Sequence, residues 1–365
     1  MIDNRDKLKE LLAKDDKLTG NEKVYIWGTG NTTMLYQEGL SRIVNRGGNI
    51  NGYVDNNSAK WGSSLNGKPI ISPDELNKIE NTLVLICSPR PEVISSVSRQ
   101  LDGMKINWRL IDDYIFRLHA DEILACYDLF DDAESKKIYA TLTECRMKGI
   151  YPPKEIIDEG AQYFSMGMFH NNDAGETYID CGAFVGDSVE RYIWSKDGMF
   201  KKIIAFEPDK KNLTAFNYRK ERLQKEWNIA DDAIAVYPYG VSDESTVNYV
   251  DAYEANNGFG TKMTTVASDN TEECRVVAID DFIKEPFGFL KADIESYEYK
   301  LLCGARKSIK EYSPNLAICI YHNAVDFFSV PLLMKEINPN YKFAIRHYTS
   351  VMSDSVVYAY TTLSE

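Results

Sequence analysis

Short apolar runs alternate with helix-like segments along most of the chain, and this alternation constrains the fold more than any other feature. In the first part the runs are residues 24–27, 53–55 and 83–87, and each leads into turn residues and a helical pattern. In the second part we expect strands at residues 178–180, 203–207, 233–237, 276–279, 289–293 and 316–321. Strands separated by helices pair in parallel and are covered by helices on both faces. The sequence therefore predicts α/β domains built on parallel sheets.

Changes in this pattern mark the domain boundaries. Residues 1–113 are expected to form an amino-terminal Rossmann-like domain, and residues 114–150 a helical linker segment in which Asp132 and Ser135 are suitable capping residues. The stretch "GIYPP" at 149–153 interrupts the chain, so that residues 151–365 form the second domain. Its last part, "YKFAIRHYTSVMSDSVVYAYT", holds two strand-like runs around a polar turn. We expect these runs to form a hairpin at the edge of an otherwise parallel sheet.

The composition argues against several classes of protein. The chain has 365 residues, of which 44% are hydrophobic and 27% charged, as in an ordinary globular protein. A net charge of −13 argues against a nucleic-acid-binding protein, which normally presents a basic face. No apolar run is long enough to span a membrane, and the first residues lack the apolar core of a signal peptide. Seven dispersed cysteines without a C-x-x-C pair and four scattered histidines predict a cytoplasmic protein with reduced thiols and no zinc site.

One glycine-rich turn carries the clearest sign of a cofactor. In "ETYIDCGAFVGDSVERY", residues 176–192, a strand ends at Asp180, and the turn from Gly182 to Gly186 leads into an amphipathic helix. Such a turn lets the backbone approach a ligand closely. A dinucleotide site prefers G-x-G-x-x-G, whereas Asp180 would repel a pyrophosphate and suit a cationic ligand without phosphate, such as S-adenosylmethionine. Taken alone, Asp180 is better explained as a cap of the following helix, and only the linked set of motifs favours the cofactor interpretation.

Acidic residues stand at the ends of three expected strands. These residues are Asp180, Glu207 in "IIAFEPD" and Asp293 in "FLKADIESYEY". Ligands of open parallel sheets bind outside the carboxyl ends of the strands. A carboxylate after the second strand is suited to accept hydrogen bonds from two ribose hydroxyls. The pattern therefore predicts a nucleoside site at this edge.

Several segments together resemble a known family. The stretches "YIDCGAFVGDS", "IIAFEPDKKNL", "YGVSDE", "VVAIDDFI" and "FLKADIESYEYKLLCGA" have the order and spacing found in the FkbM family of S-adenosylmethionine-dependent methyltransferases. The resemblance extends from about residue 163 to the carboxyl terminus. It departs from the family in one place, because Ser296 replaces the glycine of the usual D-x-E-G motif.

The resemblance implies a class I methyltransferase domain with a seven-stranded sheet that ends in an antiparallel hairpin. It implies that S-adenosyl-L-methionine is bound by the glycine turn and by the ends of the next two strands. The residues that would bind it are Asp180, Gly182, Ala183, Gly186, Glu207, Pro208, Gly240, Val241, Ser242 and Asp243.

Methyl transfer to an alcohol needs a base that takes the proton of the hydroxyl. Asp293, Glu295 and His322 are the candidates, and the resemblance implies that Asp293 and Glu295 face the reacting methyl group. The carboxylate pair could instead bind a divalent metal, because hard cations prefer oxygen ligands. We favour the base interpretation and expect no metal.

The amino-terminal domain is harder to interpret. "YIWGTGN" and "GYVDNNSAKWG" place a G-x-G turn and Asp55 where a Rossmann-like domain would bind a nucleotide, but Thr33 replaces the third glycine. Two interpretations of this domain remain. It binds a nucleotide or a nucleotide-sugar acceptor, or it serves only for packing or dimerisation. Dimerisation through it would make the protein a homo-oligomer.

Two functions remain. The preferred one is O-methylation of a hydroxyl on a sugar or glycan precursor. The alternative is a nucleotide-sugar-binding protein or an NAD-dependent oxidoreductase that uses the amino-terminal domain.

Overall fold

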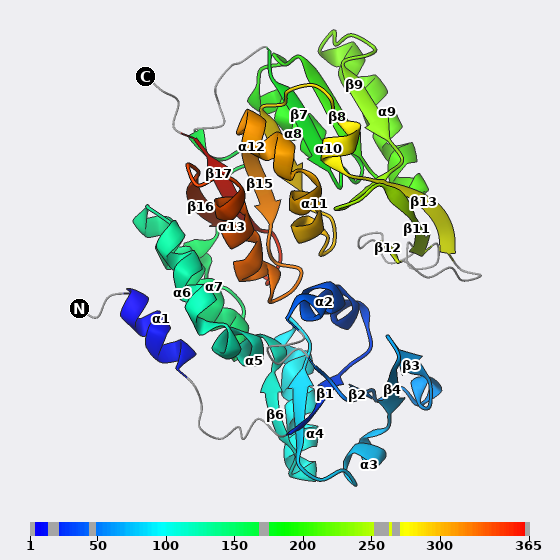
Figure 1. Cartoon of the computed structure of the whole chain (residues 1–365), viewed down its shortest axis with the longest axis vertical. Helices are drawn as coiled ribbons and strands as arrows, with labels where there is room; N and C mark the ends of the chain where they lie inside the picture. The colour runs from blue at the N-terminus through cyan, green and yellow to red at the C-terminus, as the bar shows by residue number, and fades with distance from the viewer. Residues whose placement is uncertain are drawn as a thin grey trace. The chain divides into compact units, whose positions relative to one another are not determined.

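The protein is described from a computed structural model, which describes residues 4–13, 22–43, 49–167, 175–251, 263–264 and 271–361. The chain divides into two compact units (Figure 1). The first unit comprises Met1–Asp158, Tyr321–Ser329 and Ile345–Ser353, and the second comprises Glu159–Ile320, Val330–Ala344 and Asp354–Glu365. The helical segment that we expected to be a linker therefore falls within the first unit.

The first unit contains a six-stranded sheet with the strand order β3-β4-β2-β1-β5-β6. All neighbouring strands are parallel except β3 and β4, which are antiparallel. The strands are β1 (Lys23–Trp27), β2 (Gly52–Val54), β3 (Ser64–Leu65), β4 (Lys68–Ile71), β5 (Thr82–Ile86) and β6 (Asn107–Leu110). The three runs expected here correspond to β1, β2 and β5, which form the buried centre of the sheet.

Helices complete the first unit. They are α1 (Asn4–Leu12), α2 (Asn31–Arg42), α3 (Pro73–Leu76), α4 (Pro91–Met104), α5 (Ile111–Leu118), α6 (Ala120–Leu129) and α7 (Ala133–Lys148), with short 3-10 helices at Ser58–Lys60 and Lys154–Ile156. Asp132 caps α7 as expected, because its side chain accepts a hydrogen bond of 2.7 Å from the Ser135 N–H. Gly149 ends the same helix in the left-handed conformation.

The second unit is built on a seven-stranded sheet with the order β16-β17-β15-β14-β7-β8-β9. Its strands are β7 (Thr177–Cys181), β8 (Lys202–Phe206), β9 (Ile234–Tyr237), β14 (Phe289–Ala292), β15 (Asn315–Cys319), β16 (Lys342–His347) and β17 (Ser355–Tyr360). The strands from β15 to β9 are parallel, whereas β17 pairs antiparallel with β15. The predicted seven-stranded sheet with a terminal hairpin is thereby confirmed.

One expected strand belongs elsewhere. Residues 276–279 do not extend the main sheet, because Val276 and Val277 end β13 and Ile279 begins a helix. β13 lies in a separate four-stranded sheet with the order β10-β13-β11-β12. Its strands are β10 (Gly240–Val241), β11 (Thr246–Asp251), β12 (Met263–Thr264) and β13 (Thr271–Val277). An apolar run alone does not indicate which of two sheets the strand will join. Here the antiparallel pairing of β13 with β11 places the strand in the smaller sheet.

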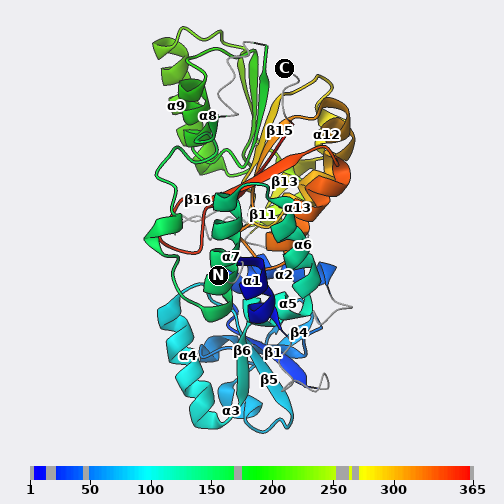
Figure 2. The ribbon, with the colours of Figure 1, turned by 90° about the vertical axis from the view of Figure 1, so that its left-hand side faces the viewer.

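The helices of this unit are α8 (Asp187–Ser195), α9 (Lys210–Glu226), α10 (Ile279–Phe282), α11 (Glu298–Gly304), α12 (Arg306–Tyr312) and α13 (Asp326–Ile337). Figure 2 shows α8 and α9 on one face of the main sheet and α12 on the other. The strands are therefore covered on both sides, which explains why every residue of β7 and β14, and every residue of β8 except the first, is buried.

Two expectations about chemistry can be compared with the fold. The seven cysteines all lie within the described residues and form no disulfide, and six of them are buried. Within the described ranges, no helix has the length and apolar composition that crossing a bilayer requires.

Candidate active site

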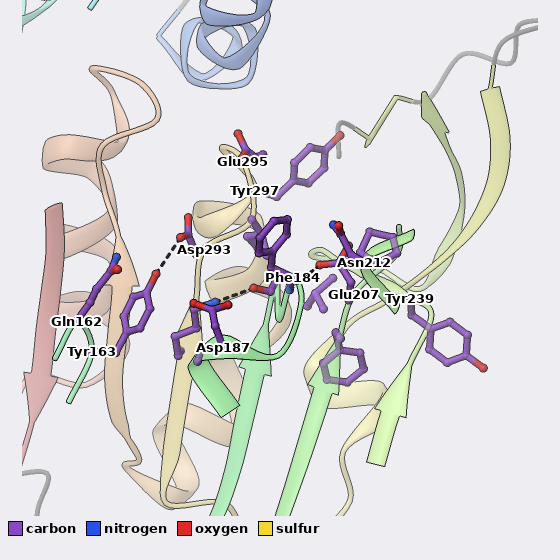
Figure 3. A pocket seen from close by; sticks show the side chains of 18 of the residues that line it. Gln162, Tyr163, Phe184, Asp187, Glu207, Asn212, Tyr239, Asp293, Glu295 and Tyr297 are labelled. Atoms are coloured by element: carbon purple, nitrogen blue, oxygen red, sulfur yellow. Dashed lines mark hydrogen bonds between the residues drawn. The ribbon is translucent and has the colours of Figure 1, made fainter. Parts of the chain in front are cut away.

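A pocket lies at the carboxyl ends of β7, β8, β9 and β14, entirely within the second unit. Its volume is about 270 Å³. It is lined by Gln162, Tyr163, Gly182, Phe184, Asp187, Ser188, Phe206, Glu207, Pro208, Asn212, Tyr239, Gly240, Val241, Lys291, Asp293, Ile294, Glu295, Tyr297 and Asp354 (Figure 3). The pocket thus occupies the edge of the sheet at which parallel α/β folds bind ligands.

The turn after β7 requires glycine at two positions. Gly182 has a φ of +77°, and a Cβ atom added to it would lie 1.9 Å from the backbone oxygen of Asp293. Gly186 has a φ of +79°, and its Cβ atom would lie 2.5 Å from the ring of Phe216. Both the left-handed backbone and the close approach exclude a larger residue. The turn is therefore packed tightly against the loop that follows β14.

Asp180 lies inside β7 and is fully buried rather than exposed in the pocket. It forms an ion pair with Lys291 of β14, with 3.1 Å between Oδ1 and Nζ, and accepts a hydrogen bond from the Ser188 hydroxyl. Lys291 also donates a 2.7 Å hydrogen bond to the carbonyl oxygen of Gly182. Burial lowers the pKa of Lys291, but Asp180 and Asp293 raise it more strongly, so that the pKa lies above its usual range. Lys291 is therefore a buried cation on β14 whose hydrogen bond to the Gly182 carbonyl links this strand to the glycine turn.

Glu207 follows β8 and is 5% exposed. Its Oε2 atom accepts a hydrogen bond from the Phe184 N–H at 2.9 Å, and its Oε1 atom accepts from the Asp209 N–H at 2.9 Å and from the Asn212 amide at 3.2 Å. Burial raises the pKa of Glu207 to about 7, although these hydrogen bonds act in the opposite direction. Since each carboxylate oxygen can accept two hydrogen bonds, Oε2 keeps the capacity for one more from a ligand.

Asp293 follows β14 and lies between Tyr163 and Phe184 in the pocket (Figure 3). Its Oδ2 atom accepts a hydrogen bond of 2.8 Å from the hydroxyl of Tyr163, whose ring lies 5.1 Å from the Lys291 ammonium. Tyr163 is buried and has a φ of +71°, which is unusual for a bulky residue. Beside it, the Gln162 amide donates a 3.1 Å hydrogen bond to Asp354. The turn at Gln162 and Tyr163 thus forms one wall of the pocket.

The loop after β14 has a strained backbone. Glu295 and Ser296 have φ values of +54° and +76°, a region that glycine favours. The family glycine that Ser296 replaces would occupy this conformation without strain. Two consecutive residues of this kind are typical of functional loops, and Glu295 lines the pocket.

The structure brings together some of the predicted residues and not others. The predicted residues that line the pocket are Gly182, Glu207, Pro208, Gly240, Val241, Asp293 and Glu295. Those outside its lining are Asp180, Ala183, Gly186, Ser242, Asp243 and His322.

One of these placements corrects the sequence interpretation. Asp180 is beneath the pocket because Lys291 holds it in the sheet, so it does not present a free carboxylate to a ligand. His322 is buried and is not among the residues that line the pocket, and its role as a base stays a prediction.

Sequence reasoning missed Lys291, Tyr163 and Asn212. A lysine inside the apolar run "FGFLKAD" was a usable signal, because a buried lysine needs an acidic partner on a neighbouring strand. Tyr163 gave no such signal, since it lies before the first recognisable strand of the domain and reaches Asp293 only through the fold.

A doubly covered, mainly parallel sheet with a pocket at its carboxyl edge defines a ligand-binding α/β domain. Residues 180–346 match the family model described as the methyltransferase FkbM domain, so the chain carries an FkbM methyltransferase domain. Residues 20–111 match a different family model, described as C2185-like, N-terminal. No match is found among curated proteins.

One solved structure supports this fold. The crystal structure of Methyltransferase FkbM from Methylobacillus flagellatus KT has a TM-score of 0.56 and 20% identity, covering 99% of this chain and 94% of that chain. An rRNA methylase from Streptococcus thermophilus has a TM-score of 0.30 and 15% identity, covering 53% of this chain and 94% of its own. An O-methyltransferase from Bacillus cereus, in complex with SAH, has a TM-score of 0.33 and 10% identity, covering 64% of this chain and 92% of its own. The first likeness supports the fold, and the other two add nothing to it.

Proposed function

We propose that this protein transfers the methyl group of S-adenosylmethionine to a hydroxyl of a sugar or glycan precursor. The observation that carries the proposal is that Asp293 and Glu207 line one pocket on either side of the Gly182 turn, because β14 and β8 flank β7 in the sheet. A nucleoside can place its ribose at Glu207 and direct its 5′ substituent toward Asp293.

The ribose would be held by two neighbouring residues. Glu207 Oε2 has capacity for one hydroxyl donor, and Asn212, which donates to Glu207, offers its amide oxygen for the second hydroxyl. Beyond the ribose, Tyr239, Gly240 and Val241 line the part of the pocket next to β9, where an adenine ring would pack.

The reaction is a displacement at carbon. The acceptor oxygen forms a bond to the methyl carbon while the carbon–sulfur bond breaks, and the electron pair of that bond stays on sulfur. The hydroxyl proton passes to a carboxylate, for which Asp293 and Glu295 line the pocket. Holding oxygen, carbon and sulfur in line supplies much of the rate enhancement.

The alternative, a nucleotide function of the amino-terminal domain, gains no support from Asp55. Its Oδ2 atom accepts a 3.1 Å hydrogen bond from the Thr29 N–H and lies 3.3 Å from the Lys60 ammonium. Its Oδ1 atom accepts a 2.9 Å hydrogen bond from the Asn57 N–H. Both carboxylate oxygens therefore stabilise the local turn, which weakens the argument for ribose binding there.

The test is transfer of labelled methyl groups from S-adenosylmethionine into cell extracts that contain nucleotide sugars and glycan precursors. We expect label in a carbohydrate as an ether that resists mild base. Label confined to protein or RNA would contradict the proposed acceptor class.

A further inference from the structure

Phe184 is an exposed aromatic residue within the glycine turn that follows β7. It lines the pocket and is 43% exposed. Its φ of +47° is unusual for a bulky residue, and backbone strain of this kind gathers at functional sites. The N–H of Phe184 donates to the Glu207 carboxylate, so the turn itself uses only the backbone of this residue. A smaller side chain would suit the turn better, and the aromatic ring therefore calls for a separate explanation.

The ring of Phe184 lies among polar and aromatic side chains of the pocket. Figure 3 shows it next to Asp293, with Glu295 and Tyr297 above it in this view. Tyr297 packs against buried residues of β13, which hold its ring in place. Two aromatic side chains and two carboxylates therefore line the same part of the pocket.

This combination of side chains fits a sugar ring. One face of a pyranose carries C–H groups, which pack against the electron-rich face of an aromatic ring. The hydroxyls of the sugar donate hydrogen bonds, and carboxylates accept them more strongly than neutral groups do. A sugar that stacks on Phe184 can therefore present a hydroxyl to Asp293 or Glu295.

The charges of the pocket favour a neutral acceptor over a phosphorylated one. Among the described residues that line it, the single basic one is Lys291, which is bound to Asp180 and to the Gly182 carbonyl. The acidic residues that line it are Asp187, Glu207, Asp293, Glu295 and Asp354. Carboxylates in a partly desolvated site repel a phosphate more strongly than they would in water.

We propose that Phe184 determines acceptor specificity by stacking on the apolar face of a neutral sugar ring, one hydroxyl of which is methylated. This inference rests on the proposed function and narrows its acceptor to a glycoside. Any phosphate of a glycan precursor then lies outside the pocket. Phe184 positions the ring, whereas the proton of the hydroxyl passes to a neighbouring carboxylate.

Saturation-transfer NMR on the full-length chain loaded with S-adenosylhomocysteine tests this contact. The probes are the methyl glycosides of glucose, galactose, mannose and rhamnose, and the 1-phosphates of the same sugars. We expect saturation of at least one methyl glycoside, strongest at the C–H protons of one ring face, and none of the phosphates.

Variants of Phe184 show whether its ring makes the contact. Phe184→Ala should weaken binding of that glycoside about tenfold, because the apolar surface that the sugar covers is lost. Phe184→Tyr keeps an aromatic face and should bind the glycoside within about twofold of the parent. Should Phe184→Ala fail to fold, Phe184→Gly provides the same comparison, since glycine suits a positive φ.

Tyr218→Ala is the matched control, since Tyr218 is 71% exposed on α9 and is not among the residues that line the pocket. It should bind the glycoside as the parent does, and all variants should bind S-adenosylhomocysteine within about twofold of the parent. Undiminished glycoside binding by Phe184→Ala, preferred binding of the sugar phosphates, or no saturation of any glycoside would overturn the proposal. A loss of S-adenosylhomocysteine affinity in Phe184→Ala would also overturn it, because the ring would then contact the donor. If the parent does not bind S-adenosylhomocysteine, the proposed function itself fails.

Discussion

Lys291 and Asp180 form a buried ion pair, 3.1 Å long, between the two central strands β14 and β7. Their side chains are 3% and 0% exposed. Lys291 also donates to the Gly182 carbonyl, so the pair connects the core of the sheet to the glycine turn of the pocket. An ion pair in this position determines where the turn lies.

Removing Lys291 should therefore be costly. Lys291→Met leaves Asp180 buried without its counter-ion, and we expect a loss of about 3–5 kcal/mol in unfolding free energy. The double variant Lys291→Met with Asp180→Asn should recover most of that loss, because no buried charge remains. The exposed pair of Lys201 and Glu285 is the control, and Lys201→Met should cost less than about 1 kcal/mol. Chemical unfolding followed by circular dichroism measures all three, and equal costs for the two single variants would contradict a special role for the pair.

Glu207 should make cofactor binding depend on pH. Its pKa of about 7 means that near neutral pH a part of the molecules carries a protonated carboxyl group, which cannot accept a ribose hydroxyl as well as the carboxylate does. Binding favours the ionised form and therefore releases protons, so affinity for S-adenosylhomocysteine should rise about tenfold between pH 6 and pH 8. Calorimetry in buffers of different ionisation heats measures the released protons directly.

Replacing Glu207 should remove this dependence. Glu207→Ala should weaken binding by about 1.5–3 kcal/mol, the value of one hydrogen bond to a charged group, and should abolish the proton release. Glu311→Ala, an exposed glutamate on α12, is the control and should behave like the parent. Unchanged affinity in folded Glu207→Ala would mean that the ribose is bound elsewhere.

The glycine turn gives a steric prediction. Gly182→Ala would place a methyl group 1.9 Å from the Asp293 carbonyl oxygen, so the turn and the β14 loop must separate. We expect cofactor binding to fall below detection in calorimetry. Gly167→Ala is the matched control, because an added Cβ atom there meets no atom within 4 Å. Normal binding by Gly182→Ala would show that the turn is not part of the site.

Replacing Glu295 should lower the rate of methyl transfer without changing the affinity for the cofactor. If it takes the acceptor proton, Glu295→Gln should lower turnover by about a hundredfold or more and remove the acidic limb of the pH–rate profile. The affinity for S-adenosylhomocysteine should stay within about twofold of the parent. Turnover with the acceptor found in the extract screen measures the effect, and a rate equal to that of the parent would assign the base elsewhere.

Much of the fold was predictable because local patterns determine it. The alternation of apolar runs with helical segments gave the parallel sheet, and the two runs after residue 341 gave the hairpin of β16 and β17. The strand at 276–279 was misplaced, since an apolar run does not specify whether it joins the main sheet or pairs with β11. Strand assignment of that kind depends on long-range pairing.

The site was predictable only in part for a similar reason. Glu207 and Asp293 follow strands directly, so strand order places them at one edge. Asp180 looked like an equivalent carboxylate, but its chemistry is set by Lys291, which lies 111 positions later and meets it only across the sheet. Tyr163 and Asp354 lie outside the family match at residues 180–346, and tertiary contacts alone bring them to the pocket.

The most direct test of the central claim is a calorimetric titration of the full-length chain with S-adenosylhomocysteine and, separately, with NADH. We predict binding of one S-adenosylhomocysteine per chain, with thermal stabilisation of about 2.7 kcal/mol at a hundred times the dissociation constant. NADH should give neither heat nor stabilisation. Binding of NADH without any response to S-adenosylhomocysteine would contradict a methyl-donor site in the second unit.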